Sequence, residues 1–300
     1  MRPTPLAAAL LAVAVACVAY SAPPPLPADL SNLERLPLFD PAELKIWTTA
    51  ESSVQASTDR TRGTTPALHW HVTVDFNAGE PKYPIGWPRV LRNFPAGPLR
   101  DWSGWDYLHG WVYVATNREK LPGVPAGLGL HTPDRAGAYQ RTLSELRANA
   151  WAEIRIPISQ IPRAHDVRQI QFHIAEQNYR HGDQLDFYFS DLALFRHIAP
   201  KLLEFSPESS VLFSSVRDLS LRVQLTGSAP GQPVEISCAL HAGERLIARE
   251  SLRASRGVQV IAFELGSRNL SPGEYELRAN LGRGTSPAIA RFRLVESPWK

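Results

Sequence analysis

Cysteine is nearly absent from this sequence, which has two, Cys17 and Cys238, among 300 residues. Cys17 lies in an apolar N-terminal segment, so a chain cleaved after that segment keeps one thiol and has no internal disulfide. This favours a bacterial periplasmic or secreted protein over a eukaryotic extracellular one. Cys238 lies on the apolar face of an expected strand, which predicts a buried, unreactive thiol. That face also carries Val234, Ile236 and Leu240.

Blocks of one charge and the motifs of common enzyme classes are also missing. The formal net charge is +3, and no basic run would follow a phosphate backbone, so nucleic acid is not expected as a partner. The chain has no Gly-x-Ser-x-Gly elbow, His-Glu-x-x-His helix, P-loop or dinucleotide-binding glycine motif. Carboxylates such as Asp106, Glu153 and Glu176 are isolated, and they form a glycosidase pair only if the fold brings two together. We therefore assign no catalytic residue.

The one long apolar run is N-terminal, over residues 6–18. It follows a basic residue and precedes small residues that suit signal peptidase, so we expect residues 1–21 to be a signal peptide. The mature protein would then be secreted, periplasmic or on the cell surface of a bacterium. The alternatives are a retained anchor helix, which the prolines at 23–25 would end at once, and a lipid tether at Cys17.

Short alternating segments dominate the rest of the chain. Residues 22–35 are predicted to be a Pro-rich linker with at most a short helical turn over 30–36. Clear strand patterns follow at 68–76, 151–158, 167–174 and 186–195. Only residues 142–148 look briefly helical, so a βαβ architecture is not expected.

The second half repeats this spacing with seven expected strands over residues 211–295. We predict an all-β protein, with a jelly-roll β-sandwich over residues 36–198 followed by a smaller immunoglobulin-like β-sandwich over 199–300.

Aromatic residues give the strongest binding signal, in the strand expected at 106–115. One face of that strand would suffice as a core face, with Leu108, Gly110, Val112 and Val114. The other face carries Tyr107, His109, Trp111 and Tyr113. Flat rings with polar edges suit the faces of sugars, so we predict a carbohydrate-binding row. The opposite assignment, in which the aromatic face is the core, stays open.

Two polar segments, 131–141 and 175–183, each follow an apolar strand and are rich in donors and acceptors. We predict that they add selectivity, with Arg135 and Arg141 holding a carboxylate or a hydroxyl pair and Glu176 accepting from hydroxyls. The other candidates in these segments are His131, Asp134, Tyr139, Asn178 and Tyr179. The alternative is an Arg–Glu network that only ties the two loops together.

His69 and His71 lie two residues apart on the polar face of an expected strand. Two imidazoles on one side would begin a metal site, but the sequence shows no third ligand at a fixed spacing. The alternative is two ordinary surface histidines.

Residues 36–198 resemble the galactose-binding-like jelly-roll modules found among the carbohydrate-binding modules of bacterial polysaccharide-degrading enzymes. The resemblance rests on Phe39-Asp40 and Trp47 in the opening strand, the segment 53–58, the loop ending at Gly63, a strand ending in Asp75, and the closing strand 185–194.

The resemblance implies a structural calcium that joins the first and last strands through Asp40, the loop 59–63 and Asp191. It also implies a ligand on a concave sheet face.

We therefore expect a secreted, non-catalytic protein that captures a polysaccharide or glycan, as an accessory to a separately encoded hydrolase. One alternative is a sandwich-fold enzyme that cleaves glycans with Glu176 and a second acid or His131. The other is an adhesive or assembly module whose aromatic face contacts protein.

Overall fold

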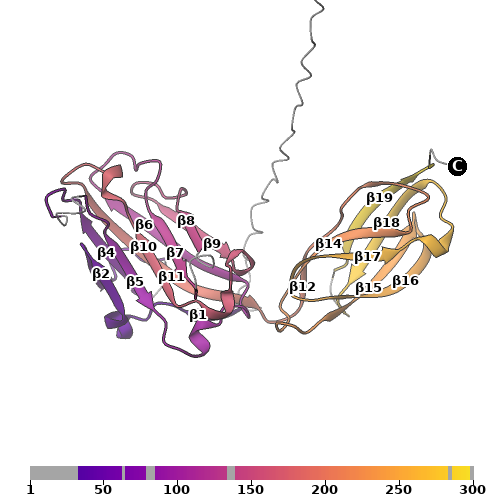
Figure 1. Ribbon diagram of the computed structural model, residues 1–300, viewed down its shortest axis with the longest axis horizontal. Coiled ribbons are helices and arrows are strands. Elements are labelled where there is room, and N and C mark those ends of the chain that lie inside the picture. The colour runs from indigo at the N-terminus through magenta and orange to yellow at the C-terminus, as the bar shows by residue number, and fades with distance from the viewer. Residues whose placement is uncertain (1–32, 63–64, 79–84, 134–138, 283–285, 298–300) are drawn as a thin grey trace, which may run out of the picture.

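The computed structural model describes residues 33–62, 65–78, 85–133, 139–282 and 286–297, which form two β-sandwiches (Figure 1). The all-β prediction is confirmed. The leader and the tether at Cys17 lie outside the described residues. Within the described part of the chain, no helix is long and apolar enough to cross a membrane.

The first sandwich consists of two antiparallel sheets. The larger, here called the β11 sheet, has the strand order β3-β4-β11-β6-β9, with β1 also paired to β11. Its strands are β1 (Leu33–Pro37), β3 (Ser53–Ser57), β4 (Ala67–Thr73), β6 (Tyr107–Thr116), β9 (Trp151–Pro157) and β11 (Gln184–His197). The other, the β10 sheet, has the order β2-β5-β10-β7-β8. Its strands are β2 (Trp47–Ala50), β5 (Arg89–Asn93), β7 (Gly127–His131), β8 (Tyr139–Thr142) and β10 (Gln169–His173).

The long strand β11 organises its sheet, because β6 pairs along one edge while β4 and then β1 pair along the other. A bulge between Ser190 and Ala193 separates the two halves, and Asp191 within it has a φ of 53°. The helical turn expected over 30–36 is wrong for residues 33–36, which belong to β1 and to the sheet rather than to a linker. The half of β11 beyond the bulge would otherwise expose an unpaired edge, and β1 satisfies its backbone groups.

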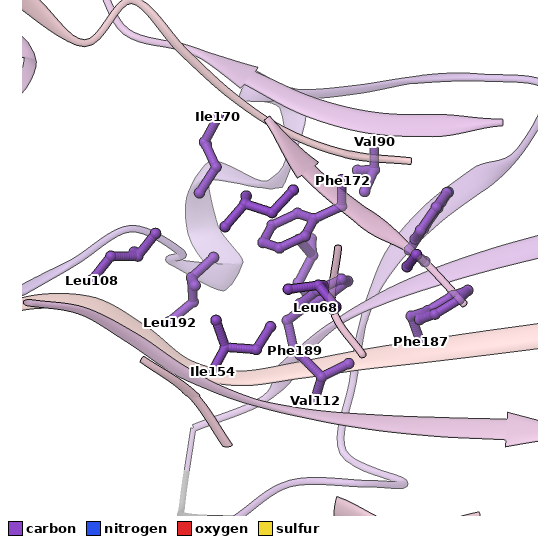
Figure 2. Packing of buried hydrophobic residues seen from close by; sticks show 14 of the residues in the cluster. Leu68, Val90, Leu108, Val112, Ile154, Ile170, Phe172, Phe187, Phe189 and Leu192 are labelled. Carbon is purple, nitrogen blue, oxygen red and sulfur yellow. The ribbon is translucent and has the colours of Figure 1, made fainter. Parts of the chain in front are cut away.

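The core of the first sandwich lies between the two sheets and is built from alternate residues of each strand (Figure 2). Trp70 stacks on Phe187 at 4.8 Å, and Phe172 contacts Phe189 at 4.3 Å between ring centroids. The segment 142–148, for which a brief helix was expected, contains the end of β8 at Thr142, a turn at 144–145 and a single bridge from Ala148 to β6.

The second sandwich packs a three-stranded sheet, β12-β14-β17, against a five-stranded sheet, β13-β19-β18-β15-β16. Its strands are β12 (Lys201–Pro207), β13 (Val211–Phe213), β14 (Asp218–Thr226), β15 (Val234–Ala242), β16 (Arg245–Ala254), β17 (Gly257–Glu264), β18 (Gly273–Asn280) and β19 (Ala288–Val295). All seven strands predicted over 211–295 are present, and β12 was not predicted.

Cys238 of β15 is fully buried, which confirms that part of the prediction, and burial raises the pKa of its thiol to about 12. The finer names, a galactose-binding-like jelly roll and an immunoglobulin-like domain, remain predictions.

Candidate functional site

The aromatic side chains of β6 lie on the outer face of the β11 sheet, away from the core. Val112 and Val114 are buried between the sheets, whereas Trp111 and Tyr113 are half-buried on the other face. The choice between core and surface is therefore decided in favour of surface for these two rings. Tyr107 and His109 belong to the same face but are 3% and 6% exposed.

Strand pairing extends this face into a row of side chains across five strands, four of which contribute a ring. The register aligns Gln55, His69, Tyr188, Tyr113 and Trp151 on β3, β4, β11, β6 and β9. His69 stacks on Tyr188 at 4.4 Å, Tyr188 lies 6.4 Å from Tyr113, and Tyr113 lies 5.5 Å from Trp151. Sequence reasoning missed Tyr188 and Trp151, because alternation gives the face of each residue but not its neighbours on the next strands.

Two arginines from the segment after β3 cover part of this row. The guanidinium of Arg62 lies 3.7 Å from the centroid of Trp111, and that of Arg60 lies 4.9 Å from Tyr113. The backbone N–H of Arg62 donates to Ser190 Oγ of β11 at 3.0 Å, which holds the segment on the sheet. Both arginines are exposed, so the face combines aromatic rings with accessible positive charge.

His109 extends the polar edge of this face. Its Nε2 lies 3.1 Å from Glu153 on the neighbouring strand, and its ring packs edge-on against Trp111 and Phe195. Burial lowers the pKa of His109 below its ordinary value. Strand pairing sets Glu153 beside Trp111, and the contact with His109 holds its carboxylate at this edge.

The described residues of the predicted polar segments make their contacts away from the aromatic row. Arg141 donates to Glu145 at 2.8 Å and to the backbone carbonyl of Arg155 at 3.2 Å. Glu176 is 3% exposed, and its two carboxylate oxygens accept from the backbone N–H groups of Gly86 and Asp75. These side chains hold loops together, and Glu176 is not presented to a ligand.

The remaining candidates of these segments lie at the strand ends of the β10 sheet. The hydroxyl of Tyr179 donates to the carbonyl of Pro125, and burial raises its pKa. Asn178 donates to Val124 at 3.4 Å, and His131 and Tyr139 are half-buried on β7 and β8. Asp134 and Arg135 lie outside the described residues.

A hollow of about 220 Å³ lies where the two polar segments approach one another. It is lined by Val124, Ala126, Gly127, Gln140, Arg141, Thr142, His173 and Ala175. Arg141 is the one described residue of the predicted set that lines this hollow, whereas Trp111 and Tyr113 lie on the outer face of the β11 sheet.

The residues predicted to hold calcium have other partners. Asp40 accepts from the backbone N–H of Ala42 at 2.9 Å, at the start of the 3-10 helix η2 (Pro41–Ile46), and Asp191 pairs with Arg35 at 3.0 Å. Calcium at these residues remains a prediction. Among the described residues, a different trio of metal-ligating side chains converges: His69, His71 and Asp186.

The sequence matches no protein-family model, and no curated protein matches it significantly. Among solved structures, an agarase is 9% identical with a TM-score of 0.37, over 53% of this chain and 24% of that one. The glycoside hydrolase domain of Endo-D from Streptococcus pneumoniae is 10% identical with a TM-score of 0.28, over 82% of this chain and 37% of that one. The adhesin domain of Epf from Streptococcus pyogenes is 8% identical with a TM-score of 0.23, over 85% and 82% of the two chains. The chain thus spans less than half of either glycoside hydrolase, and similarities at this level assign it neither a family nor an activity.

Proposed function

We propose that the outer face of the β11 sheet binds a polysaccharide or glycan. The observation that carries the proposal is the placement of Trp111, Tyr113 and Trp151, which are half-buried on one outer face while alternate residues fill the core. A side chain that is not needed for packing, yet is large, flat and partly exposed, is available to stack on the C–H face of a sugar ring.

The surroundings of these rings supply hydrogen-bonding groups. Arg60 and Arg62 lie over Tyr113 and Trp111, and Glu153 is paired directly with Trp111 across β6 and β9. A sugar on the rings would displace the exposed guanidinium groups, which would then donate to hydroxyl or carboxylate oxygens. Such a mixture of stacking surface and charged donors is typical of sites that select a ligand by orientation.

We favour binding over cleavage because Glu176, the acid of the enzyme alternative, has a structural role. Both carboxylate oxygens of Glu176 accept backbone hydrogen bonds, and the side chain is almost fully buried. A general acid needs contact with the glycosidic oxygen, which this arrangement does not offer.

The test is affinity electrophoresis of the full chain through gels that contain neutral or acidic polysaccharides. We expect retardation by at least one polysaccharide, and an affinity that is lower by about tenfold or more in Trp111→Ala and in Tyr113→Ala. A tenfold loss corresponds to about 1.4 kcal/mol of binding free energy. Trp87→Ala is the matched control, because Trp87 is 47% exposed and contacts His173 of the β10 sheet instead.

Near-ultraviolet circular dichroism would verify that each variant is folded. Retardation by no polysaccharide, or equal losses for Trp87→Ala and Trp111→Ala, would overturn the proposal. Binding to a partner protein that sugars do not compete away would favour the adhesive alternative.

A further inference from the structure

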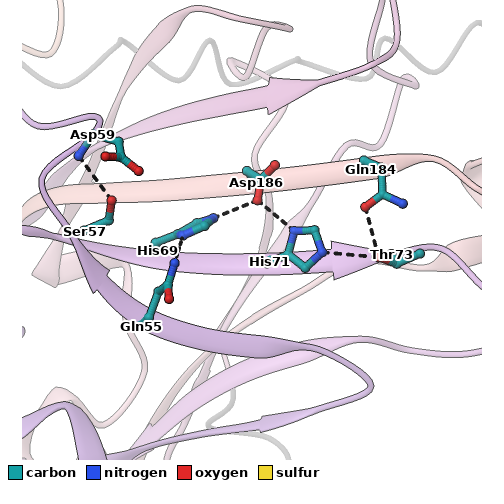
Figure 3. A network of polar contacts seen from close by, with 8 residues as sticks. All are labelled: Gln55, Ser57, Asp59, His69, His71, Thr73, Gln184 and Asp186. Atoms are coloured by element: carbon teal, nitrogen blue, oxygen red, sulfur yellow. Dashed lines mark hydrogen bonds and ion pairs between the residues drawn. The ribbon is translucent and has the colours of Figure 1, made fainter.

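We propose that His69, His71 and Asp186 form a binding site for a divalent transition metal, with Zn²⁺ as the best match. The three side chains come from neighbouring strands of the β11 sheet (Figure 3). Alternation places His69 and His71 on the same outer face of β4, and the register sets Asp186 of β11 directly opposite His71. Their candidate ligand atoms all lie within 4.8 Å of one another.

A single carboxylate oxygen is the meeting point of the trio. Asp186 Oδ1 lies 2.7 Å from His69 Nε2 and 2.7 Å from His71 Nδ1. An ionised carboxylate only accepts, so each nitrogen must carry a proton toward this oxygen when no cation is present.

The ring of His71 is also held on its other side. Its Nε2 lies 3.2 Å from the hydroxyl of Thr73, which donates to Gln184 Oε1 at 3.0 Å. These contacts orient the ring so that Nδ1 faces Asp186, where a metal ion could bind both side chains.

The donor set suits zinc. Two imidazole nitrogens and a carboxylate oxygen are a common protein ligand set for Zn²⁺, with bonds of about 2.0–2.2 Å and a fourth position left open. Tetrahedral ligands at that bond length lie about 3.3 Å apart, so Asp186 Oδ1 would move about 0.6 Å from each nitrogen, and the ligand atoms, which now lie up to 4.8 Å apart, would draw together around the ion. The partly exposed side chains of His71 and Asp186 have room for such a movement.

The ligands are oriented by a second layer of contacts and are open to solvent on one side. Gln55 Nε2 lies 2.9 Å from His69 Nδ1, and the ring of Tyr188 stacks on His69. When His69 binds metal through Nε2, its Nδ1 carries the proton and Gln55 turns its amide oxygen to accept it. The side chains of His71 and Asp186 are 38% and 27% exposed, which gives an ion a path into the site.

The test uses the full chain without a polyhistidine tag, stripped with a chelator and titrated with Zn²⁺ by calorimetry. We expect one Zn²⁺ per chain, with binding weakened at least about 100-fold in His71→Ala and Asp186→Asn and about tenfold in Gln55→Leu. His181→Ala is the matched control, because His181 is an exposed histidine that also pairs with an aspartate, Asp75, away from the trio. Its affinity should equal that of the unmodified protein.

Co²⁺ gives an independent reading, because its visible absorption is strong in tetrahedral sites and weak in octahedral ones. A tetrahedral spectrum that disappears in Asp186→Asn would support the site. Substoichiometric Zn²⁺ binding, or equal affinities for His71→Ala and His181→Ala, would overturn the proposal. Because these readings involve no sugar, a failure of the metal site is distinguishable from a failure of glycan binding.

Discussion

The carboxylate of Asp106 in the first sandwich is hydrogen-bonded to the guanidinium of Arg256 in the second. The same guanidinium donates to the backbone carbonyl of Gly104 at 2.6 Å, and Asp106 also accepts from the backbone N–H of His197 at 2.7 Å. The side chains of Asp106 and Arg256 are 5% and 12% exposed, so the pair is shielded from solvent. In the sequence Asp106 is only an isolated carboxylate, but in the structure its ion pair with Arg256 links the two sandwiches.

Removing one member of this pair should destabilise the first sandwich. Asp106→Ala leaves the guanidinium of Arg256 buried without its charge partner, and we expect the free energy of unfolding to fall by about 3–5 kcal/mol. Urea denaturation followed by tryptophan fluorescence measures this well, because seven of the eight tryptophans precede residue 198. Arg256→Met and the double variant complete a double-mutant cycle. Purely additive effects of the two substitutions would contradict the coupling.

The same aspartate should make the protein sensitive to acid. Burial by itself would raise the pKa of Asp106, but hydrogen bonds from His197 and the charge of Arg256 outweigh it and lower the pKa below its ordinary value. A carboxyl group whose pKa is depressed on folding stabilises the protein above its unfolded pKa, and this contribution is lost as the pH falls through the folded pKa. Unfolding free energies between about pH 5 and pH 2 should therefore fall less steeply for Asp106→Asn than for the unmodified chain. If the unfolding free energies of the two proteins changed in parallel with pH, Asp106 would make no contribution to the acid sensitivity.

The substitution Glu176→Gln distinguishes a structural role of this glutamate from a catalytic one. The amide keeps one acceptor oxygen, so either Gly86 or Asp75 loses the partner of its backbone N–H, and we expect a loss of about 1–3 kcal/mol. The exposed Glu119→Gln should change stability by less than about 0.5 kcal/mol. Polysaccharide binding should survive in both variants. Turnover of a glycan that Glu176→Gln abolishes without unfolding would instead establish the enzyme alternative.

Cys238 should react with a thiol reagent only when the second sandwich unfolds. The side chain is fully buried, and burial raises the pKa of its thiol to about 12, so neither access nor thiolate is available in the folded state. The measurement is the rate of labelling in a Cys17→Ala background, with and without denaturant. Cys238→Ser places an unpartnered hydroxyl in the core and should cost about 1–3 kcal/mol. Rapid labelling of the folded chain would contradict this packing.

Much of the fold follows from local alternation. A period of two is visible in 211–295, and it predicted seven strands there, because each strand must bury one face against the opposite sheet. The same period separated the core face of β6 from the face that carries Trp111 and Tyr113. Strand β1 was missed, since its few residues show little alternation and its partner, the far half of β11, lies about 160 residues away.

The polar segments show what composition alone leaves open. Their density of donors and acceptors predicted a ligand site, but Glu176 and Arg141 satisfy groups of the protein itself. A carboxylate can accept hydrogen bonds from buried backbone N–H groups or from a ligand. The sequence does not show which of these two roles a given carboxylate has.

What the sequence by itself determined is the direction of side chains along each strand, because that direction depends only on the backbone period. It therefore placed His69 and His71 on one face of their strand, and Trp111 and Tyr113 on one face of another, without deciding whether the second face is core or surface. Only the tertiary structure decided which strands are neighbours and in what register. That choice brought Asp186 beside two histidines about 115 residues earlier in the chain, and Tyr188 and Trp151 into the row of rings. Pairing of distant strands is set by the packing of the whole sandwich, so no local pattern specifies it.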